Sequence, residues 1–184
     1  MTKIPEIIGD NIQIYEDALA NSNLKLFEDL DSEHFPWHIS KIIDEKDGDP
    51  VPKENENLQF VHTVYKDHAP YSNYFNMCVP LLDFNQAKSV YRIKINLTFP
   101  TKEPKKLGEM HNDLLWVNEG IVDCKVAIFY PFKTNGQLHI KEGKEIHEIE
   151  NNGNQVIKFP NQLKHLGISN TDENLRFAVN IVYF

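Results

Sequence analysis

The stretch VYRIKINLTF (residues 90–99) alternates apolar and polar side chains along its whole length. The alternation places Tyr91, Ile93, Ile95 and Leu97 on one side and Arg92, Lys94 and Asn96 on the other. Side chains two residues apart in an extended strand point to the same face. The stretch therefore predicts a β-strand that buries one face.

Seven further short stretches follow, each rich in β-branched or aromatic residues and bounded by turn signals such as TNG, KEG, NNGN and SNTDEN. They occupy residues 110–116, 124–132, 137–140, 145–150, 155–160, 164–168 and 175–184. Residues 100–109, rich in Pro and Lys, read as a loop. Eight short strands with turn-length gaps indicate a sandwich, a jelly roll or a barrel.

The N-terminal half has a mixed pattern. We expect two short strands or a hairpin at 7–15, a helix with an apolar stripe at 16–32, a loop at 44–57, a strand at 58–66 and a helix containing Pro80 at 72–86. At 184 residues the chain predicts a single domain, residues 1–184. We expect the N-terminal helices to pack against the β-rich part.

Composition excludes several classes of function. The net charge of −8 lies in residues 1–57, which hold 14 acids and 5 bases, and such an acidic surface argues against a nucleic-acid partner. No apolar run approaches the roughly 18 residues of a membrane span, and no secretory leader is visible. Two cysteines, Cys78 and Cys124, make no disulfide framework, so we expect a cytoplasmic protein with reduced thiols.

One group of residues has the pattern of a metal site. His111 and Asp113 form an H-x-D pair on a predicted strand, where both side chains point to one face, and His165 follows 52 residues after Asp113. Two histidines and a carboxylate form the facial triad of non-haem iron oxygenases. Arg176, one of only two arginines beside 17 lysines, heads the last predicted strand, and arginine binds carboxylates bidentately.

The same region resembles a known family. In order, the chain reads HNDLLW (111–116), VAIFYPF (126–132), TNGQLHI (134–140), QVIKFP (155–160), KHLG (164–167) and RFAVNIVYF (176–184). This order is similar to the 2-oxoglutarate/Fe(II)-dependent dioxygenase superfamily and its prolyl 4-hydroxylase-like branch, especially short enzymes of phages and marine bacteria. The resemblance covers residues 90–184. It departs at Gly136-Gln137, where many relatives have a Gly-Gly pair.

The resemblance implies a fold and a division of the chain. The fold is mainly β with flanking helices (α+β), with a double-stranded β-helix (a cupin-like jelly roll) as its core. Residues 90–184 would form this jelly-roll catalytic core. Residues 1–89 would form an N-terminal buttress of helices and strands packed against it.

The resemblance also assigns roles to residues. His111, Asp113 and His165 would hold Fe(II), while Arg176 and Tyr130 would bind the distal carboxylate of the cosubstrate 2-oxoglutarate. Asn96 is a weaker candidate for the cosubstrate pocket. O2 would be the second cosubstrate, with ascorbate as a reductant.

The implied activity is hydroxylation of a substrate that the sequence does not identify, coupled to decarboxylation of 2-oxoglutarate to succinate. A peptidyl proline, another protein side chain or a small molecule fits the branch. Nucleic acid does not, because Val182 stands where the demethylase branch has a second arginine. The alternative is a cupin-like jelly-roll protein that binds ligands or serves a structural role without oxygenase activity.

Overall fold

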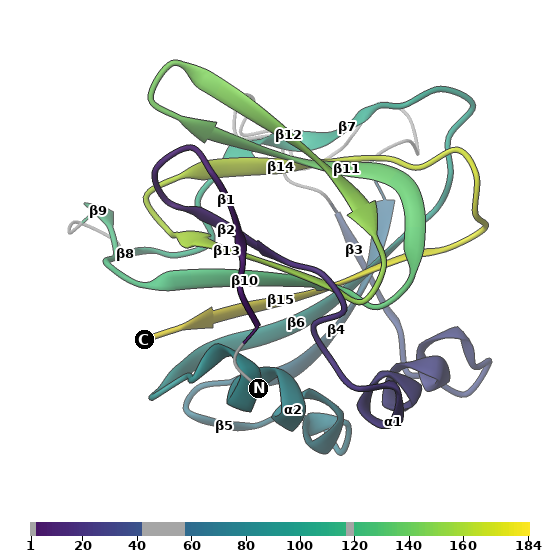
Figure 1. Cartoon of the computed structure of the whole chain (residues 1–184). Helices are drawn as coiled ribbons and strands as arrows, with labels where there is room; N and C mark the ends of the chain where they lie inside the picture. Colours follow the sequence, from purple (N-terminus) through teal and green to yellow (C-terminus); the bar gives the residue numbers. More distant parts are fainter. Residues whose placement is uncertain (1–2, 42–57, 117–119) are drawn as a thin grey trace.

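The computed structural model describes residues 3–41, 58–116 and 120–184 (Figure 1). The N-terminal part contains β1 (Glu6–Ile8), β2 (Ile12–Tyr15), α1 (Asn21–Leu24), the 3-10 helix η1 (Lys25–Asp31), β3 (His38–Lys41), β4 (Leu58–Lys66), β5 (Ala69–Pro70) and α2 (Phe75–Asn85). The C-terminal part contains β6 (Val90–Thr98), β7 (Lys106–His111), β8 (Leu115–Trp116), β9 (Gly120–Ile121), β10 (Lys125–Tyr130), β11 (Lys133–Glu142), β12 (Glu145–Asn152), β13 (Gln155–Pro160), β14 (Lys164–Ile168) and β15 (Arg176–Tyr183).

Two antiparallel sheets form the body of the molecule (Figure 1). The larger has the order β1-β2-β13-β10-β15-β6-β4-β3, with β5 beside β4, and the smaller has the order β12-β11-β14-β7. From β6 onward the chain visits the two sheets in alternation, apart from the β11–β12 hairpin in the smaller sheet and the short β8–β9 pair. This winding is a double-stranded β-helix, which confirms the predicted fold class.

The larger sheet buries both of its faces. Toward the smaller sheet it packs an aliphatic cluster that includes Ile128, Ile157 and Leu138. Its opposite face packs against α1, η1 and α2, in a cluster that includes Phe27 and Phe129. The helices therefore cover the sheet from outside (Figure 1).

The N-terminal predictions are mostly confirmed. The hairpin at 7–15, the strand at 58–66 and the Pro80-containing helix inside 72–86 are all present. The helix expected at 16–32 is reduced to one α-turn at Asn21–Leu24 and the 3-10 segment η1. Neither segment has a side-chain N-cap hydrogen bond that would stabilise a longer helix. The larger sheet continues across the 89/90 boundary, since β4 pairs with β6. The loop expected at 44–57 lies outside the described residues.

Three predictions for the C-terminal part are wrong in detail. The loop expected at 100–109 is shorter, because Lys106–His111 already forms β7 along β14. His111 ends that strand, and Asp113 lies in the bend beyond it. The TNG triplet (134–136) is no turn but part of β11, at an irregularity in its register between Lys133 and Gln137.

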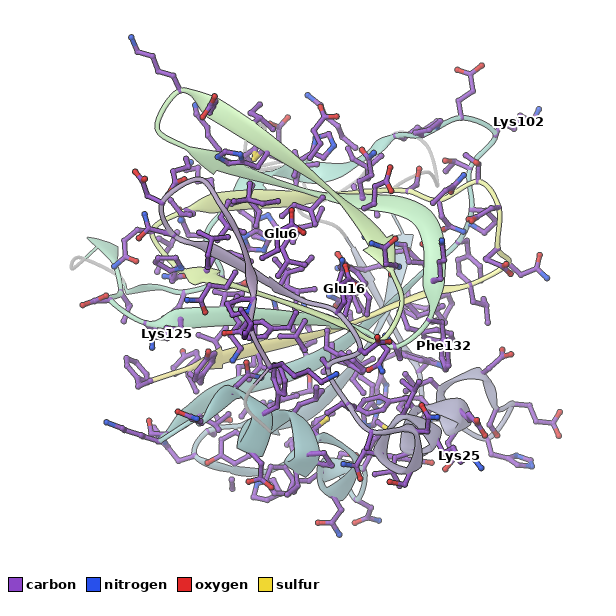
Figure 2. All side chains as sticks on the ribbon, in the orientation of Figure 1. Glu6, Glu16, Lys25, Lys102, Lys125 and Phe132 are labelled. Atoms are coloured by element: carbon purple, nitrogen blue, oxygen red, sulfur yellow. The ribbon has the colours of Figure 1, made fainter. Side chains whose placement is uncertain are left out.

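Charged side chains project from the outside of this body, as Lys25 and Lys102 do in Figure 2. Within the described ranges, no helix is long and apolar enough to cross a membrane.

Candidate metal centre and carboxylate clamp

Two neighbouring strands and a bend bring the three candidate ligands together. His111 on β7 lies directly opposite His165 on β14, so both imidazoles point to the same face, with ring centroids 4.7 Å apart. Asp113 Oδ2 lies 3.4 Å from His165 Nε2. One ligand atom from each of the three residues lies within 4.8 Å of the others. The described residues hold no other such group of three or more.

Asn161 fixes the bend that carries Asp113. Its buried side-chain oxygen accepts the Leu114 N–H at 3.1 Å, and its Nδ2 donates to the Leu114 carbonyl at 2.8 Å. The Asn112 side chain donates to the Asn161 carbonyl at 2.6 Å. The residues on both sides of Asp113 are thus tied to Asn161, Leu114 through its backbone and Asn112 through its side chain, which places the carboxylate without a strand.

Two further side chains orient the Asp113 carboxylate. Arg92 Nη2 donates to Oδ1 at 2.8 Å, and Asn180 Nδ2 donates to Oδ2 at 2.9 Å. Burial by itself raises the pKa of the Asp113 carboxyl, but the charges of His165 and Arg92 and the hydrogen bond from Asn180 outweigh it and hold that pKa below its usual range. Asp113 is therefore ionised at neutral pH, as a metal ligand must be.

Burial and hydrogen bonding also prepare the two imidazoles for metal binding. Burial lowers the pKa of the His165 imidazole to about 4, against the opposing effect of the Asp113 carboxylate, so the ring is neutral at pH 7. His111 Nδ1 lies 2.9 Å from the Glu109 carbonyl, which can only accept, so Nδ1 carries the proton and Nε2 is free to bind. Two imidazoles and one carboxylate fit Fe(II), because this donor set leaves coordination positions open for other ligands.

Three strands, β10, β11 and β14, surround the Arg176 side chain. Its Nη2 donates to the Tyr130 hydroxyl at 3.0 Å and to the Gln137 carbonyl at 3.1 Å. A Cβ at Gly136 would lie only 2.7 Å from Arg176 Nε, and one at Gly167 would lie 3.4 Å from Nη1. The guanidinium fits because the glycines at these positions have no side chains.

The charge of Arg176 is buried without a carboxylate partner. The residue is 4% exposed, its Nε has no hydrogen-bond partner, and no described acid forms an ion pair with it. A buried charge without a counter-charge is costly. Burial also raises the pKa of Tyr130 despite the opposing charge of Arg176, so the phenol stays protonated and can still donate its hydrogen. The pair offers donors suited to an anionic oxygen.

Asn96 forms no hydrogen bond or ion pair with these groups within the described part of the chain. It lies on β6 opposite Ala178 of β15, and its buried Oδ1 has no hydrogen-bond partner. No contact joins it to the triad or to Arg176 among the interactions of the described residues, so its role stays a prediction.

Three residues of the site carried no assignment from the sequence. Arg92 and Asn180 hold Asp113, and Gly136 makes room for Arg176. The period-2 pattern of residues 90–99 places Arg92 on the polar face, and its rarity in a lysine-rich chain was the available signal. Asn180 sits in an apolar run that offers no such signal.

Solved structures with this architecture share the fold of one family. An oxidoreductase of the 2OG-Fe(II) oxygenase family from Burkholderia pseudomallei superposes with a TM-score of 0.67 at 14% identity, covering 94% of this chain and 84% of that one. A prolyl hydroxylase from Trichoplax adhaerens, in complex with a hypoxia-inducible-factor peptide, superposes with a TM-score of 0.64 at 10% identity. The match covers 95% of this chain and 83% of that one. A Pseudomonas putida prolyl-4-hydroxylase superposes with a TM-score of 0.61 at 10% identity, and the match covers 94% of this chain and 91% of that one.

The fold is therefore that of the 2-oxoglutarate/Fe(II) oxygenases, as the resemblance implied. Within that fold, prolyl hydroxylases and enzymes with small-molecule substrates both align along almost the whole chain. No protein-family model matches the sequence. The curated proteins likewise give no match in sequence.

Proposed function

We propose that the protein is a 2-oxoglutarate- and Fe(II)-dependent oxygenase that hydroxylates its substrate. The observation that carries the proposal is the joint placement of the triad and of a buried arginine that has no acidic partner. The triad supplies the donor set for Fe(II), and the arginine supplies the counter-charge for a carboxylate. A cupin that only binds or supports would have no need of a buried guanidinium at this position.

His111, Asp113 and His165 hold the iron in this proposal. Bound Fe(II) together with 2-oxoglutarate supplies the oxidising chemistry with O2, releasing succinate and CO2. The protein's own part is placement: Arg92 and Asn180 fix the Asp113 carboxylate, and the Glu109 carbonyl fixes the His111 tautomer.

Arg176 and Tyr130 bind the distal carboxylate of 2-oxoglutarate. Arg176 provides the charge, and Tyr130 donates the hydroxyl hydrogen that its own contact with Arg176 leaves free. Asn96 remains a weaker candidate for the wall of the same pocket. Ascorbate serves as the external reductant.

A protein side chain or a small molecule is the proposed substrate class. One structural neighbour is a prolyl hydroxylase bound to a peptide, and another is the carbocyclase SnoK of nogalamycin biosynthesis, which supports both options. Peptidyl proline is the first substrate to test, and the cytoplasm is the proposed location.

The test is anaerobic spectroscopy with Fe(II), 2-oxoglutarate and ascorbate. We expect a weak visible metal-to-ligand charge-transfer band in the wild type and none in His111→Ala. His139→Ala is the matched control, because His139 lies on β11 and its side chain has a hydrogen bond, among the described residues, to the Gln137 side chain alone. A band that is absent from the wild type, or that survives in His111→Ala, would leave the cupin-like alternative. A succinate-release assay over peptide and metabolite pools then identifies the substrate by a mass gain of one oxygen atom.

A further inference from the structure

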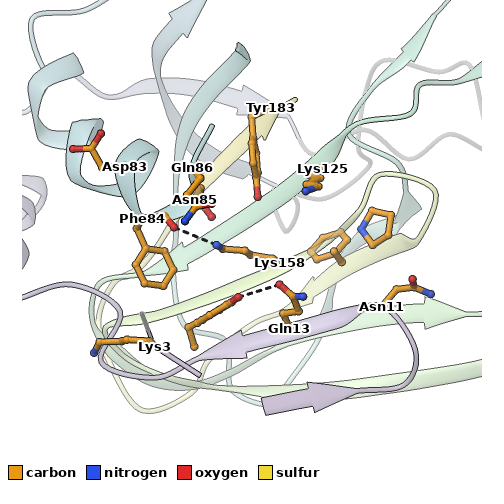
Figure 3. A pocket seen from close by; sticks show the side chains of 13 residues that line it. Lys3, Asn11, Gln13, Asp83, Phe84, Asn85, Gln86, Lys125, Lys158 and Tyr183 are labelled. Carbon is orange, nitrogen blue, oxygen red and sulfur yellow. Dashed lines mark hydrogen bonds between the residues drawn. The ribbon is translucent and has the colours of Figure 1, made fainter. Parts of the chain in front are cut away.

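A cavity lies on the outer face of the larger sheet, beside the end of α2 (Figure 3). Its volume is about 750 Å³, within the range of small-molecule sites. Its walls come from β2, β10, β13, β15 and α2, with Gln13, Tyr15, Phe84, Lys125, Lys158 and Tyr183 among them. Lys158 alternates along β13 with Ile157, which packs between the two sheets. The cavity is therefore on the opposite face of the sheet from the triad.

Lys158 projects into this cavity between two aromatic rings. Its ammonium lies 4.6 Å from the ring centroid of Tyr15 and 4.6 Å from that of Phe84. Its hydrogen bond is a long one, at 3.4 Å to the Phe84 carbonyl (Figure 3). Among the residues that the structure describes, no carboxylate forms an ion pair with Lys158.

A second amine increases the unbalanced positive charge. Lys125 lines the same cavity close enough for its charge to act on Lys158. Lys3 contributes little, because its ammonium contacts the backbone carbonyls of Glu16 and Asp17. The carboxylate of Asp83 points away from Lys158 (Figure 3). Two like charges near one another and without a counter-ion favour an anion between them.

We propose that this cavity binds a small aromatic carboxylate. The carboxylate lies between Lys158 and Lys125, and its ring packs against Tyr15, Phe84 and Tyr183. The two ammonium groups select the charge, and the aromatic walls select a flat apolar body. This site is independent of the oxygenase proposal, since it shares no side chain with the triad or with Arg176.

The test is a titration of the isotope-labelled full chain with benzoate, followed by backbone amide NMR. Saturating 2-oxoglutarate is present in one arm to occupy Arg176. We expect amide shifts at the end of α2 and along β13 and β15 in both arms. Benzamide, which has the same shape but no charge, should bind at least about tenfold more weakly, and acetate likewise for lack of a ring. Shifts confined to the surroundings of Arg176, or equal binding of benzamide, would overturn the proposal.

Matched variants localise the effect. Lys158→Met keeps the length of the side chain and removes its charge, and it should weaken benzoate binding by about tenfold. Lys125→Met should act in the same direction, while Lys141→Met, an exposed change on β11, should leave binding unchanged. Thermal unfolding of each variant checks that the fold is intact. Unchanged affinity in both cavity variants would refute the assignment.

Proton uptake on binding distinguishes a Lys158 that contacts the bound anion from a Lys158 that only stabilises the fold. Burial, aided by the charge of Lys125, lowers the pKa of the Lys158 ammonium to about 8. The other ionisable groups that line the cavity are Lys3, Tyr15, Asp83, Lys125 and Tyr183, and of these the Asp83 carboxylate points away from Lys158. A bound anion favours the ammonium, so benzoate binding should take up protons near pH 8 and weaken as pH rises further. Calorimetry in buffers of different ionisation enthalpy measures the uptake, and Lys158→Met should abolish it. No uptake in the wild type would contradict the proposed contact.

Discussion

The two faces of the larger sheet differ in what their side chains do: one face packs against the helices, and the other carries the polar residues of the candidate site. Strand β15 shows the division residue by residue: Phe177 and Val179 face the helices, whereas Arg176 and Asn180 face the candidate metal centre. The outer face is packed with aromatic and aliphatic side chains except at the cavity beside α2. The inner face carries buried polar atoms without partners, including Arg176 Nε, Arg92 Nε and Asn96 Oδ1.

This difference shows which part of the protein contains groups that lower the free energy of unfolding. Unpaired buried polar groups destabilise a fold, and they persist where a ligand or a reaction needs them. The inner face is therefore best understood as incomplete without its ligands, whereas the helix-covered face, away from the cavity beside α2, is closed by apolar packing. Each of the following changes tests one side of that division.

The largest effect is expected from His111→Ala on the inner face. Loss of one of three ligands should lower succinate formation by about a thousandfold or more, because metal binding requires the full donor set. Thermal stability without metal should change little. His139→Ala is the control, and comparable loss of activity in both variants would contradict the assignment of the triad.

Phe129→Ala tests the outer face. Phe129 is fully buried and packs against Phe27, with ring centroids 5.0 Å apart. Truncation should lower the free energy of unfolding by about 3–5 kcal/mol, measured by urea denaturation. Phe99→Ala, at a residue 45% exposed, should cost less than about 1 kcal/mol. The folded fraction of Phe129→Ala should still bind Fe(II); a loss of metal affinity would mean that the two faces are not separable.

Arg176→Met returns to the inner face. Removing the charge should raise the apparent requirement for 2-oxoglutarate about 10- to 100-fold, the range of a charge-assisted contact. Unfolding of the ligand-free protein should not become easier, since an unpaired buried charge has been removed. Arg176→Lys should fall between, because an ammonium cannot reproduce the two-point contact. Unchanged dependence on 2-oxoglutarate would remove Arg176 from its assigned role.

The smallest effect is expected from substitution of the two glycines that make room for Arg176. In Gly136→Ala the new methyl group would displace the Arg176 side chain, so the requirement for 2-oxoglutarate should rise by about tenfold. Gly167→Ala makes a milder contact at 3.4 Å and should have a smaller effect. The charge-transfer band should persist with 2-oxoglutarate at saturation in both. If the two alanines act equally, the contact with Arg176 is not the cause.

Sequence reasoning succeeded where a local pattern determines the structure. Period-2 alternation predicted β6, and the order of strands and turns predicted the jelly roll. The three residues predicted as ligands also lie close together in the structure. The reason given for that convergence was wrong, because Asp113 is not on a strand but is placed by Asn161, 48 residues away in the chain.

The remaining features depend on contacts between distant segments. The role of Asn180 becomes visible only when β15 lies beside β6 and Asp113 folds over both, and nothing local marks it. Gly136 resembles a turn glycine in sequence, yet its function is to leave space for Arg176. A glycine that matters because it has no side chain cannot be recognised from the sequence, since the residue that occupies the free space is distant in the chain.

The position of β15 also has a kinetic consequence. This strand is inserted between β10 and β6, so the centre of the larger sheet stays open until it arrives. Before insertion, β10 and β6 each present an unpaired edge, and such edges pair readily with other chains. Its partners are distant in sequence, and such pairings form slowly. The strand that completes the carboxylate clamp is thus also the one that covers two strand edges at the centre of the larger sheet.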